Sequence, residues 1–143
     1  MLRQTNPPIN AFPRLRRAGN AGVGISEGGD GMRVLDREAV AEALPWSDLI
    51  EALRRVFATG CAAPLRHRHA AGEGNTLLLM PAWDSRCTGV KIVHVAPGNA
   101  SRGLPAVHAE YLLSDAATGA PIALLDGGEL TDRRTAATSV LAA

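Results

Sequence analysis

The pattern of apolar and polar positions becomes regular at Met32, and the first elements that it predicts are a short strand and a short helix. Residues 33–35 form an apolar run of strand character. Asp36 follows and has the short polar side chain that accepts a backbone N–H at a helix start. We therefore expect a helix from Asp36 through Ala43, ended near Pro45, because proline cannot continue a helix.

A second, longer helix is predicted from Trp46. Apolar residues recur every three or four positions between Trp46 and Phe57, which places them on one helix face. Gly60 follows the last of them and is suited to the backbone conformation that ends a helix. We expect Trp46 and Phe57 to pack in the core.

The middle of the chain predicts an antiparallel β-meander. Segments of strand length that are apolar, or that alternate between apolar and polar residues, span residues 76–80, 89–95, 106–114 and 122–126. Pro81 is expected to end the first of these strands, and Asp115–Gly119 has the composition of a hairpin loop. The predicted fold class is α+β: two N-terminal helices packed on an antiparallel meander, followed by the first part of a further helix.

That further helix, predicted within residues 129–143, carries an arginine near its start. Thr131 is suited to be its N-cap, and small and apolar residues follow. Arg134 would then lie in the first turn, where a cation is unfavourable because that end of a helix is already positive. Two interpretations stay open: a solvated arginine, or an arginine that binds an anion together with the free N–H groups of the helix.

Composition and charge exclude several classes of protein. The 143 residues are 46% hydrophobic and 20% charged, which is typical of a globular domain. A formal net charge of +1 gives no electrostatic basis for binding nucleic acid. No apolar run approaches the roughly 20 residues that a membrane helix needs. Cys61 and Cys87 are the two cysteines, too few for a disulfide framework, so a cytoplasmic location is expected.

Residues 1–31 differ from the rest of the chain. They are rich in proline, glycine and arginine and have no periodic apolar pattern. We expect them to be a disordered or non-native extension. Within them, Gly22-x-Gly24 is near a dinucleotide-binding fingerprint, but no predicted strand precedes it and no predicted helix follows, so we reject it.

Lys91 stands in the middle of a predicted strand. Strand alternation places it on the same face as Val93 and Val95, within an apolar run. A lysine there is costly unless its ammonium reaches water or a partner. It either extends to solvent at a sheet edge, or it is a functional cation that binds a carboxylate or transfers a proton.

A second candidate cation lies in the segment 64–69. In an extended conformation Arg66 and Arg68 point to one side, and His67 and His69 to the other. The planar guanidinium fork of Arg66 suits a carboxylate. The two histidines have the spacing of a strand-borne metal pair, but no zinc-ligand pattern surrounds them, and we expect no metal.

Five short motifs resemble the ornithine cyclodeaminase/mu-crystallin family, in its order and at plausible spacings. They are Pro64-Leu-Arg66, Leu79-Met-Pro-Ala82, Gly89-Val-Lys91, Gly103-Leu-Pro followed by Ala109-x-Tyr-Leu-Leu, and Leu130-Thr-x-x-Arg134-Thr-Ala-Ala. One such motif would be weak evidence, but five in order are hard to produce by chance. Ala106 departs from the pattern, because family members usually carry Thr or Ser there, and this leaves room for altered specificity or weaker binding.

The resemblance implies an NAD(P)-dependent enzyme and assigns roles to individual residues. Lys91 matches the lysine of the family's substrate pocket and is the expected catalytic residue. Arg66 matches an arginine that contacts the amino-acid carboxylate, and Arg134 matches one at the junction of substrate and cofactor. The expected substrate-binding residues are therefore Arg66, Lys91 and Arg134, and the expected contacts with NAD or NADP are Arg134 and Thr135.

Two reactions are compatible with this resemblance. One is the conversion of ornithine to proline and ammonia. The other is the reduction of a cyclic ketimine, pyrroline-2-carboxylate or piperideine-2-carboxylate, and the substrate pocket alone does not separate them. Family members pair through the sheet of this domain, so a homodimer is implied, and no nucleic acid or membrane is expected as a partner.

The resemblance also implies a division into domains. Residues 32–130 would form the substrate-binding and dimerisation domain, and residues 131–143 the start of the helix that leads to a Rossmann domain. Family members place that domain, with the general acid aspartate used in ornithine deamination, after this helix. We therefore expect the N-terminal portion only and no turnover by this polypeptide alone, and a non-catalytic binding or dimerisation module stays open.

Overall fold

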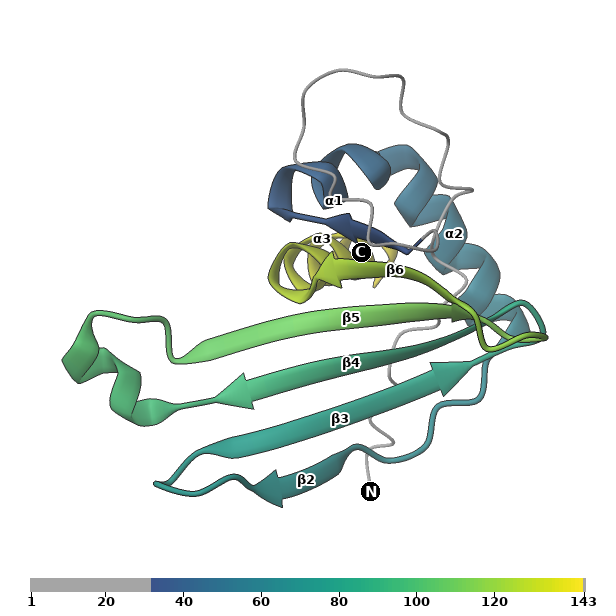
Figure 1. Ribbon diagram of the computed structural model, residues 1–143. Coiled ribbons are helices and arrows are strands. Elements are labelled where there is room, and N and C mark those ends of the chain that lie inside the picture. The colour runs from purple at the N-terminus through teal and green to yellow at the C-terminus, as the bar shows by residue number, and fades with distance from the viewer. Residues whose placement is uncertain (1–31, 143) are drawn as a thin grey trace.

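A six-stranded mixed sheet carries the fold (Figure 1). The computed structural model describes residues 32–142, so the predicted extension 1–31 lies outside the described residues. In spatial order the strands are β1 (Arg33–Leu35), β6 (Pro121–Asp126), β5 (Val107–Asp115), β4 (Cys87–Val95), β3 (Thr76–Trp83) and β2 (His67–Ala70). Neighbours from β6 to β3 are antiparallel, as in the predicted meander. β2, which was not among the predicted strands, adds antiparallel to β3, and β1 joins the other edge parallel to β6. The α+β class is confirmed, and the sheet is mixed.

Three α-helices gather at the β1–β6 end of the sheet (Figure 1). They are α1 (Arg37–Ala43), α2 (Trp46–Thr59) and α3 (Gly127–Ala142); a short 3-10 helix, η2 (Pro97–Arg102), connects β4 to β5. α1 contacts β6, and α3 lies against β5 and packs on both other helices. α2 differs from the prediction, because three of its buried residues, Leu49, Ala52 and Leu53, form a cluster with Ala137 of α3.

The ends of the first two helices agree with the local sequence signals. The Asp36 side chain accepts a hydrogen bond from the backbone N–H of Ala39 at 2.9 Å, which caps α1. Gly60 ends α2 with a φ of +78°, a left-handed value that suits glycine. The prediction that Trp46 and Phe57 lie in the core is wrong, since they are 48% and 53% exposed. Trp46 is the first residue of α2 and contacts an arginine of α3 instead.

β3 continues through Pro81 to Trp83, so the prediction that Pro81 ends this strand is wrong. The backbone N–H of Trp83 donates to the carbonyl of Ala62 at 2.9 Å, on the side of β3 away from β4. Residues two apart on a strand direct their N–H groups to the same side. The N–H that Pro81 lacks would therefore have faced away from β4, and no hydrogen bond of that ladder is lost.

The turn between β5 and β6 agrees with the predicted hairpin loop. The carboxylate of Asp115 accepts hydrogen bonds from the N–H groups of Ala117 and Thr118 at 3.0 and 2.8 Å. Gly119 has a φ of +73°, the left-handed conformation expected of a glycine in this loop.

The two faces of the sheet are unequal. Among the described residues, every buried strand residue lies on the face that the helices cover, here called the helix-covered face. These residues are Leu35, Ala82, Gly89, Val93, Tyr111, Leu113, Ala123 and Leu125. The opposite face, here called the open face, has half-exposed apolar residues and all four histidines of the chain. Lys91 shares the helix-covered face with Val93, and strand alternation predicted that these two residues lie on one face.

Candidate active site

Lys91 is held on an interior strand and reaches α3. β4 lies between β3 and β5, where Lys91 pairs with Met80 on one side and Tyr111 on the other. The side chain is half-buried, and its Nζ donates a hydrogen bond to Oγ1 of Thr131. Lys91 therefore does not extend to solvent at a sheet edge, which was one of the two interpretations of the sequence.

The helix that carries Thr131 and Arg134 begins earlier than the sequence analysis placed it. α3 starts at Gly127, directly after β6, and the Asp126 carboxylate accepts from the N–H of Glu129 at 2.6 Å. Asp126 thus fills the capping position. Two predictions are wrong: Thr131 is not the N-cap, and Arg134 does not lie in the first turn. A local signal was present, because Asp126 and Glu129 have the three-residue spacing of a capping motif.

Gly127 explains why the strand runs directly into the helix. A Cβ atom at this position would lie 2.6 Å from the carbonyl carbon of Ala109 on β5. The start of α3 therefore rests directly on the backbone of β5, an approach that only glycine permits. The position of Thr131, one turn later, is consequently set by the sheet.

Arg134 lies on the same side of α3 as Thr131, because residues three apart on a helix are neighbours. Its side chain is half-buried, and burial lowers the pKa of its guanidinium. Within residues 32–142 it makes no hydrogen bond or ion pair through that guanidinium. The pKa of Lys91 is lowered first by burial and then by the charge of Arg134, which shows that the two cations lie within electrostatic range.

Arg66 lies one residue before β2 and is exposed. β2 pairs His67 with Leu79, so the same register continued by one residue places Arg66 opposite Met80, which itself pairs with Lys91. Arg66 and Lys91 then occupy one row of the helix-covered face, two strands apart, or roughly 10 Å between backbones. The charge of Arg66 also lowers the pKa of Lys91, whereas that of Asp132 raises it.

Tyr111 on β5 pairs with Lys91 on β4 and lies on the same face of the sheet. The sequence analysis did not name it as a site residue. A Cβ atom on Gly89 would overlap the hydroxyl of Tyr111, so the glycine of the Gly-Val-Lys motif makes room for that ring. Burial raises the pKa of Tyr111, which keeps the phenol neutral. The sequence did contain a signal for this contact, because Gly89 and Tyr111 both belong to the motifs that resemble the family.

Thr135 is exposed on α3, and its carbonyl accepts from the hydroxyl of Ser139 at 3.0 Å. The β6–α3 junction, with Gly127 and Gly128, is a strand-to-helix turn, and the free N–H groups at the start of a helix can bind an anion. Asp126 already occupies that helix end with its own carboxylate, so the junction does not fit an anionic pyrophosphate. The roles of Arg134 and Thr135 toward a cofactor stay predictions.

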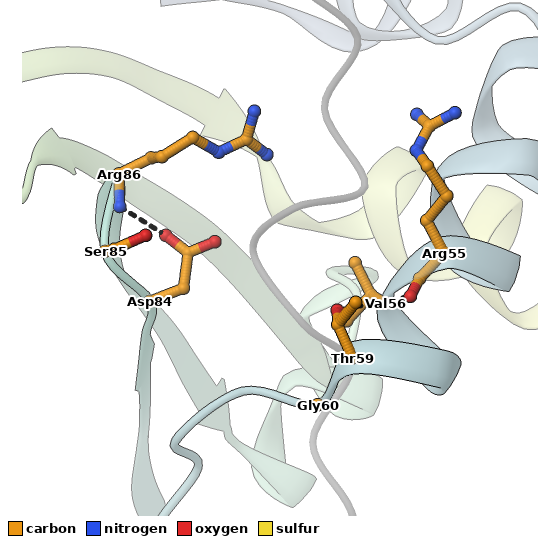
Figure 2. Close-up of a pocket in the computed structure, with 7 residues that line it drawn as sticks. All are labelled: Arg55, Val56, Thr59, Gly60, Asp84, Ser85 and Arg86. Atoms are coloured by element: carbon orange, nitrogen blue, oxygen red, sulfur yellow. Dashed lines mark hydrogen bonds between the residues drawn. The ribbon is translucent and has the colours of Figure 1, made fainter.

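A separate hollow of about 400 Å³ lies between the end of α2 and the turn from β3 to β4 (Figure 2). Arg55 and Arg86 extend from opposite sides of this hollow, and the carboxylate of Asp84 accepts from the N–H of Arg86 at 2.8 Å. None of the predicted site residues, Arg66, Lys91, Arg134 and Thr135, lines it. Among residues 32–142 there is also no group of three or more histidine, cysteine, aspartate or glutamate side chains that could hold a metal ion.

Comparison with known proteins gives the relatives of this chain. A Δ1-pyrroline-2-carboxylate reductase of Burkholderia multivorans is 36% identical over 112 residues, which cover 76% of this chain and 36% of the reductase. The solved structure of a Δ1-pyrroline-2-carboxylate reductase of Thermococcus litoralis, in complex with NADH and L-proline, matches with a TM-score of 0.63 and 34% identity. That match covers 74% of this chain and 35% of the reductase.

A lysine cyclodeaminase structure that describes recognition of L-lysine, L-ornithine and L-2,4-diaminobutyric acid matches with a TM-score of 0.61 and 30% identity, over 76% of this chain and 36% of the other. The chain thus spans about a third of the length of these relatives. They are two reductases and one cyclodeaminase, and the Thermococcus litoralis reductase is described in complex with NADH. None of the helices within residues 32–142 is long and apolar enough to cross a membrane. Residues 33–143 match the ornithine cyclodeaminase/mu-crystallin family, and the chain belongs to this family.

Proposed function

We propose that this chain is the substrate-binding half of an NAD(P)-dependent enzyme that acts on a small α-amino or cyclic α-imino acid. Lys91 and Arg134, with Arg66 at the edge, bind the substrate carboxylate. The observation that carries this proposal is the half-buried pair of Lys91 and Arg134, within electrostatic range of each other, in which the guanidinium of Arg134 has no hydrogen-bond or ion-pair partner among the described residues.

The positive charges of Lys91 and Arg134 favour binding of an anion between them. Two cations brought together in a partly buried place repel each other, and burial adds a desolvation cost to both. A carboxylate between them would offset both costs and accept charge-assisted hydrogen bonds. The guanidinium offers the planar fork that suits two carboxylate oxygens, and the lysine offers a compact charge.

The reduction of a cyclic imine is the first candidate reaction. When bound, NAD(P)H would supply the hydride for the imine carbon. Lys91, Arg134 and Arg66 would orient the substrate through its carboxylate, and the amine of Lys91 is placed to hold or transfer a proton. The abundance of cations favours pyrroline-2-carboxylate or piperideine-2-carboxylate over ornithine, whose side chain brings an additional ammonium group.

Conversion of ornithine to proline and ammonia is the second candidate. It is supported by the likeness to a lysine cyclodeaminase, a protein described as recognising L-ornithine. In this reaction the same cations would bind the carboxylate of ornithine. The negative charge of Asp132 raises the pKa of Lys91 and would favour an additional ammonium group, although this carboxylate already pairs with Arg37 of α1 at 3.2 Å.

We also propose that two copies of the chain pair through the open face. This face has half-exposed apolar residues on four neighbouring strands: Leu79, Ile92, Leu112 and Leu124. A second sheet packed on it would remove this apolar area from water. Light scattering at micromolar concentration should give the mass of a dimer, and a monomer would contradict the pairing.

Binding of L-proline to this chain tests the proposed site. L-Prolinamide has the same ring but no negative charge, so it is the matched control. We expect L-proline to shift the NMR signals of Lys91 and Arg134, and L-prolinamide to leave them unchanged. Equal binding of both ligands, or no binding of L-proline, would contradict the proposal. A reductase should bind L-proline more tightly than L-ornithine, whereas comparable affinity would favour the cyclodeaminase.

A further inference from the structure

The hydroxyl of Thr131 takes part in two hydrogen bonds. Together they determine whether it is a donor or an acceptor toward Lys91. Its hydroxyl donates to the carbonyl of Gly127, four residues earlier in α3, at 2.5 Å. The same oxygen accepts from Nζ of Lys91 on β4. A hydroxyl has one proton. Because that proton is already donated to Gly127, Thr131 can act toward Lys91 only as an acceptor.

We propose that Thr131 is a positioning residue that fixes the direction of the Lys91 amine in both of its protonation states. This inference rests on the proposed function of the site. A charged lysine has three N–H groups, of which one is donated to Thr131 and two stay available to a carboxylate. A neutral lysine has two N–H groups and a lone pair, and donating one N–H to Thr131 leaves the lone pair on the ligand's side.

The bond to Gly127 is the part of this arrangement that matters for proton transfer. A hydroxyl free to rotate could donate its proton to the lone pair of neutral Lys91 and so compete with the substrate for it. The carbonyl of Gly127 prevents that rotation. Thr131 therefore holds the amine without neutralising its basicity, which is what a lysine that exchanges protons with a substrate requires.

Contacts between the start of α3 and the sheet set the position of Thr131. Gly127 rests on the backbone of Ala109 in β5, and the Asp126 carboxylate caps the helix at the same point. The acceptor oxygen is thus placed by the sheet and the helix start, before any ligand binds. A threonine at this position in the Leu-Thr-x-x-Arg-Thr motif then serves Lys91, forty residues earlier in the chain.

Two substitutions separate the hydroxyl from the shape of the side chain, and a third is the matched control. Thr131→Val removes the oxygen and keeps the volume, whereas Thr131→Ser keeps the oxygen. Thr138→Val removes a hydroxyl that donates in the same way, to the carbonyl of Arg134 at 2.8 Å, but that does not contact Lys91. The measurements are the pKa of Lys91, followed through its Cε signal by NMR, and the affinity for L-proline.

We expect Thr131→Val to lower the pKa of Lys91 further, because an acceptor that stabilises the ammonium is lost. We expect it to weaken L-proline binding about tenfold, because the ammonium is no longer held in the direction that suits its charge-assisted hydrogen bond to the carboxylate. Thr131→Ser should return both to the wild-type values, and Thr138→Val should change neither. A Thr131→Val variant that matches Thr138→Val in both measurements would overturn the inference, as would a Thr131→Ser variant that fails like Thr131→Val.

The two proposals fail in different ways. If the wild-type chain does not bind L-proline, the proposed function fails, while the pKa comparison still tests the contact between Thr131 and Lys91. If L-proline binds but Thr131→Val leaves the pKa and the affinity unchanged, the positioning role fails and the proposed function stands.

Discussion

Arg133 and Arg134 are adjacent on α3, yet the two sides of this helix use them in opposite ways. Arg133 donates through Nε to Glu129 at 2.8 Å and through Nη1 to the carbonyl of Leu44 at 2.9 Å, and its guanidinium lies 4.6 Å from the ring centroid of Trp46. Arg134, one residue later, has no such partner within residues 32–142. The residue type alone does not decide its role.

The side of α3 that carries Arg133 joins the helices to one another. The Arg133–Glu129 ion pair is largely shielded from water, with side chains 15% and 14% exposed. Arg37 of α1 adds contacts at 3.1 Å to Glu129 and 3.2 Å to Asp132, which contribute little because Arg37 is exposed. On the side that faces Lys91, the guanidinium of Arg134 makes no ion pair with any of the described residues. The comparison teaches that an arginine paired with a carboxylate marks the structural side, and an arginine without such a pair marks the ligand side.

The largest expected effect is on stability. Arg133→Ala should lower the free energy of unfolding by about 3 kcal/mol, because it leaves the carboxylate of Glu129 shielded without its main partner. Arg134→Ala should change the same quantity by less than about 1 kcal/mol, since no bond is lost. Urea denaturation of both variants measures the difference. Equal destabilisation by the two substitutions would remove the distinction between the two sides.

For ligand binding we expect the larger loss from Arg134→Ala and little or none from Arg133→Ala. Arg134→Ala should weaken binding of L-proline by about 10- to 100-fold, the worth of a charge-assisted hydrogen bond. It should also raise the pKa of Lys91, because the charge of Arg134 lowers it in the wild type. Titration of L-proline into Arg133→Ala, at a temperature where that variant is folded, should give the wild-type affinity. A large loss in Arg133→Ala would contradict the assignment.

The pH dependence of binding sharpens the comparison further. The pKa of Lys91 is lowered from the ordinary lysine value of 10.5, chiefly by burial, so the ammonium loses its proton at a lower pH than an ordinary lysine does. Carboxylate affinity should be full below this lowered pKa and fall as the pH rises through it. The ligand for this test is tetrahydrofuran-2-carboxylate, a proline analogue without an amine of its own. Arg134→Ala should move the fall to higher pH, and an affinity independent of pH would contradict a role for Lys91.

The lowered pKa of Lys91 also makes the free energy of unfolding depend on pH. Stability should rise with pH, whereas the affinity for a carboxylate should fall. The lowered pKa means that the fold disfavours the charged form of Lys91, so this lysine reduces stability most where it is fully charged. The reduction fades as the pH rises from the lowered pKa toward the 10.5 of the unfolded chain. An anion bound beside Lys91 should remove this pH dependence.

The smallest expected effect is at Trp46. Trp46→Leu removes the ring that Arg133 contacts and should lower the free energy of unfolding by about 1 kcal/mol. The affinity for L-proline should not change, because this contact lies on the structural side of α3. A measurable loss of affinity would show that the two sides are coupled.

Local signals in the sequence predicted the elements that depend on nearby residues. Asp36 caps its helix, Gly60 ends the next one and Gly119 completes a hairpin, because each acts within a few residues. Strand alternation likewise predicted that Lys91 and Val93 lie on one face of the sheet. These features require no knowledge of distant parts of the chain.

The errors arose where distant residues decide the outcome. The start of α3 depends on the contact of Gly127 with Ala109, and the continuation of β3 through Pro81 depends on which side of the strand faces β4. The bond between Lys91 and Thr131 joins residues far apart in sequence, so the role of Thr131 could be found only in three dimensions. A hydroxyl residue in a helix start is read locally as a cap, which is why that prediction was wrong.

A crystal structure of the chain grown with L-proline tests the central claim most directly. We predict the ligand on the helix-covered face, with its carboxylate within hydrogen-bonding distance of Nζ of Lys91 and of the guanidinium of Arg134. A carboxylate bound instead between Arg55 and Arg86, in the hollow of Figure 2, with Lys91 and Arg134 untouched, would contradict the account.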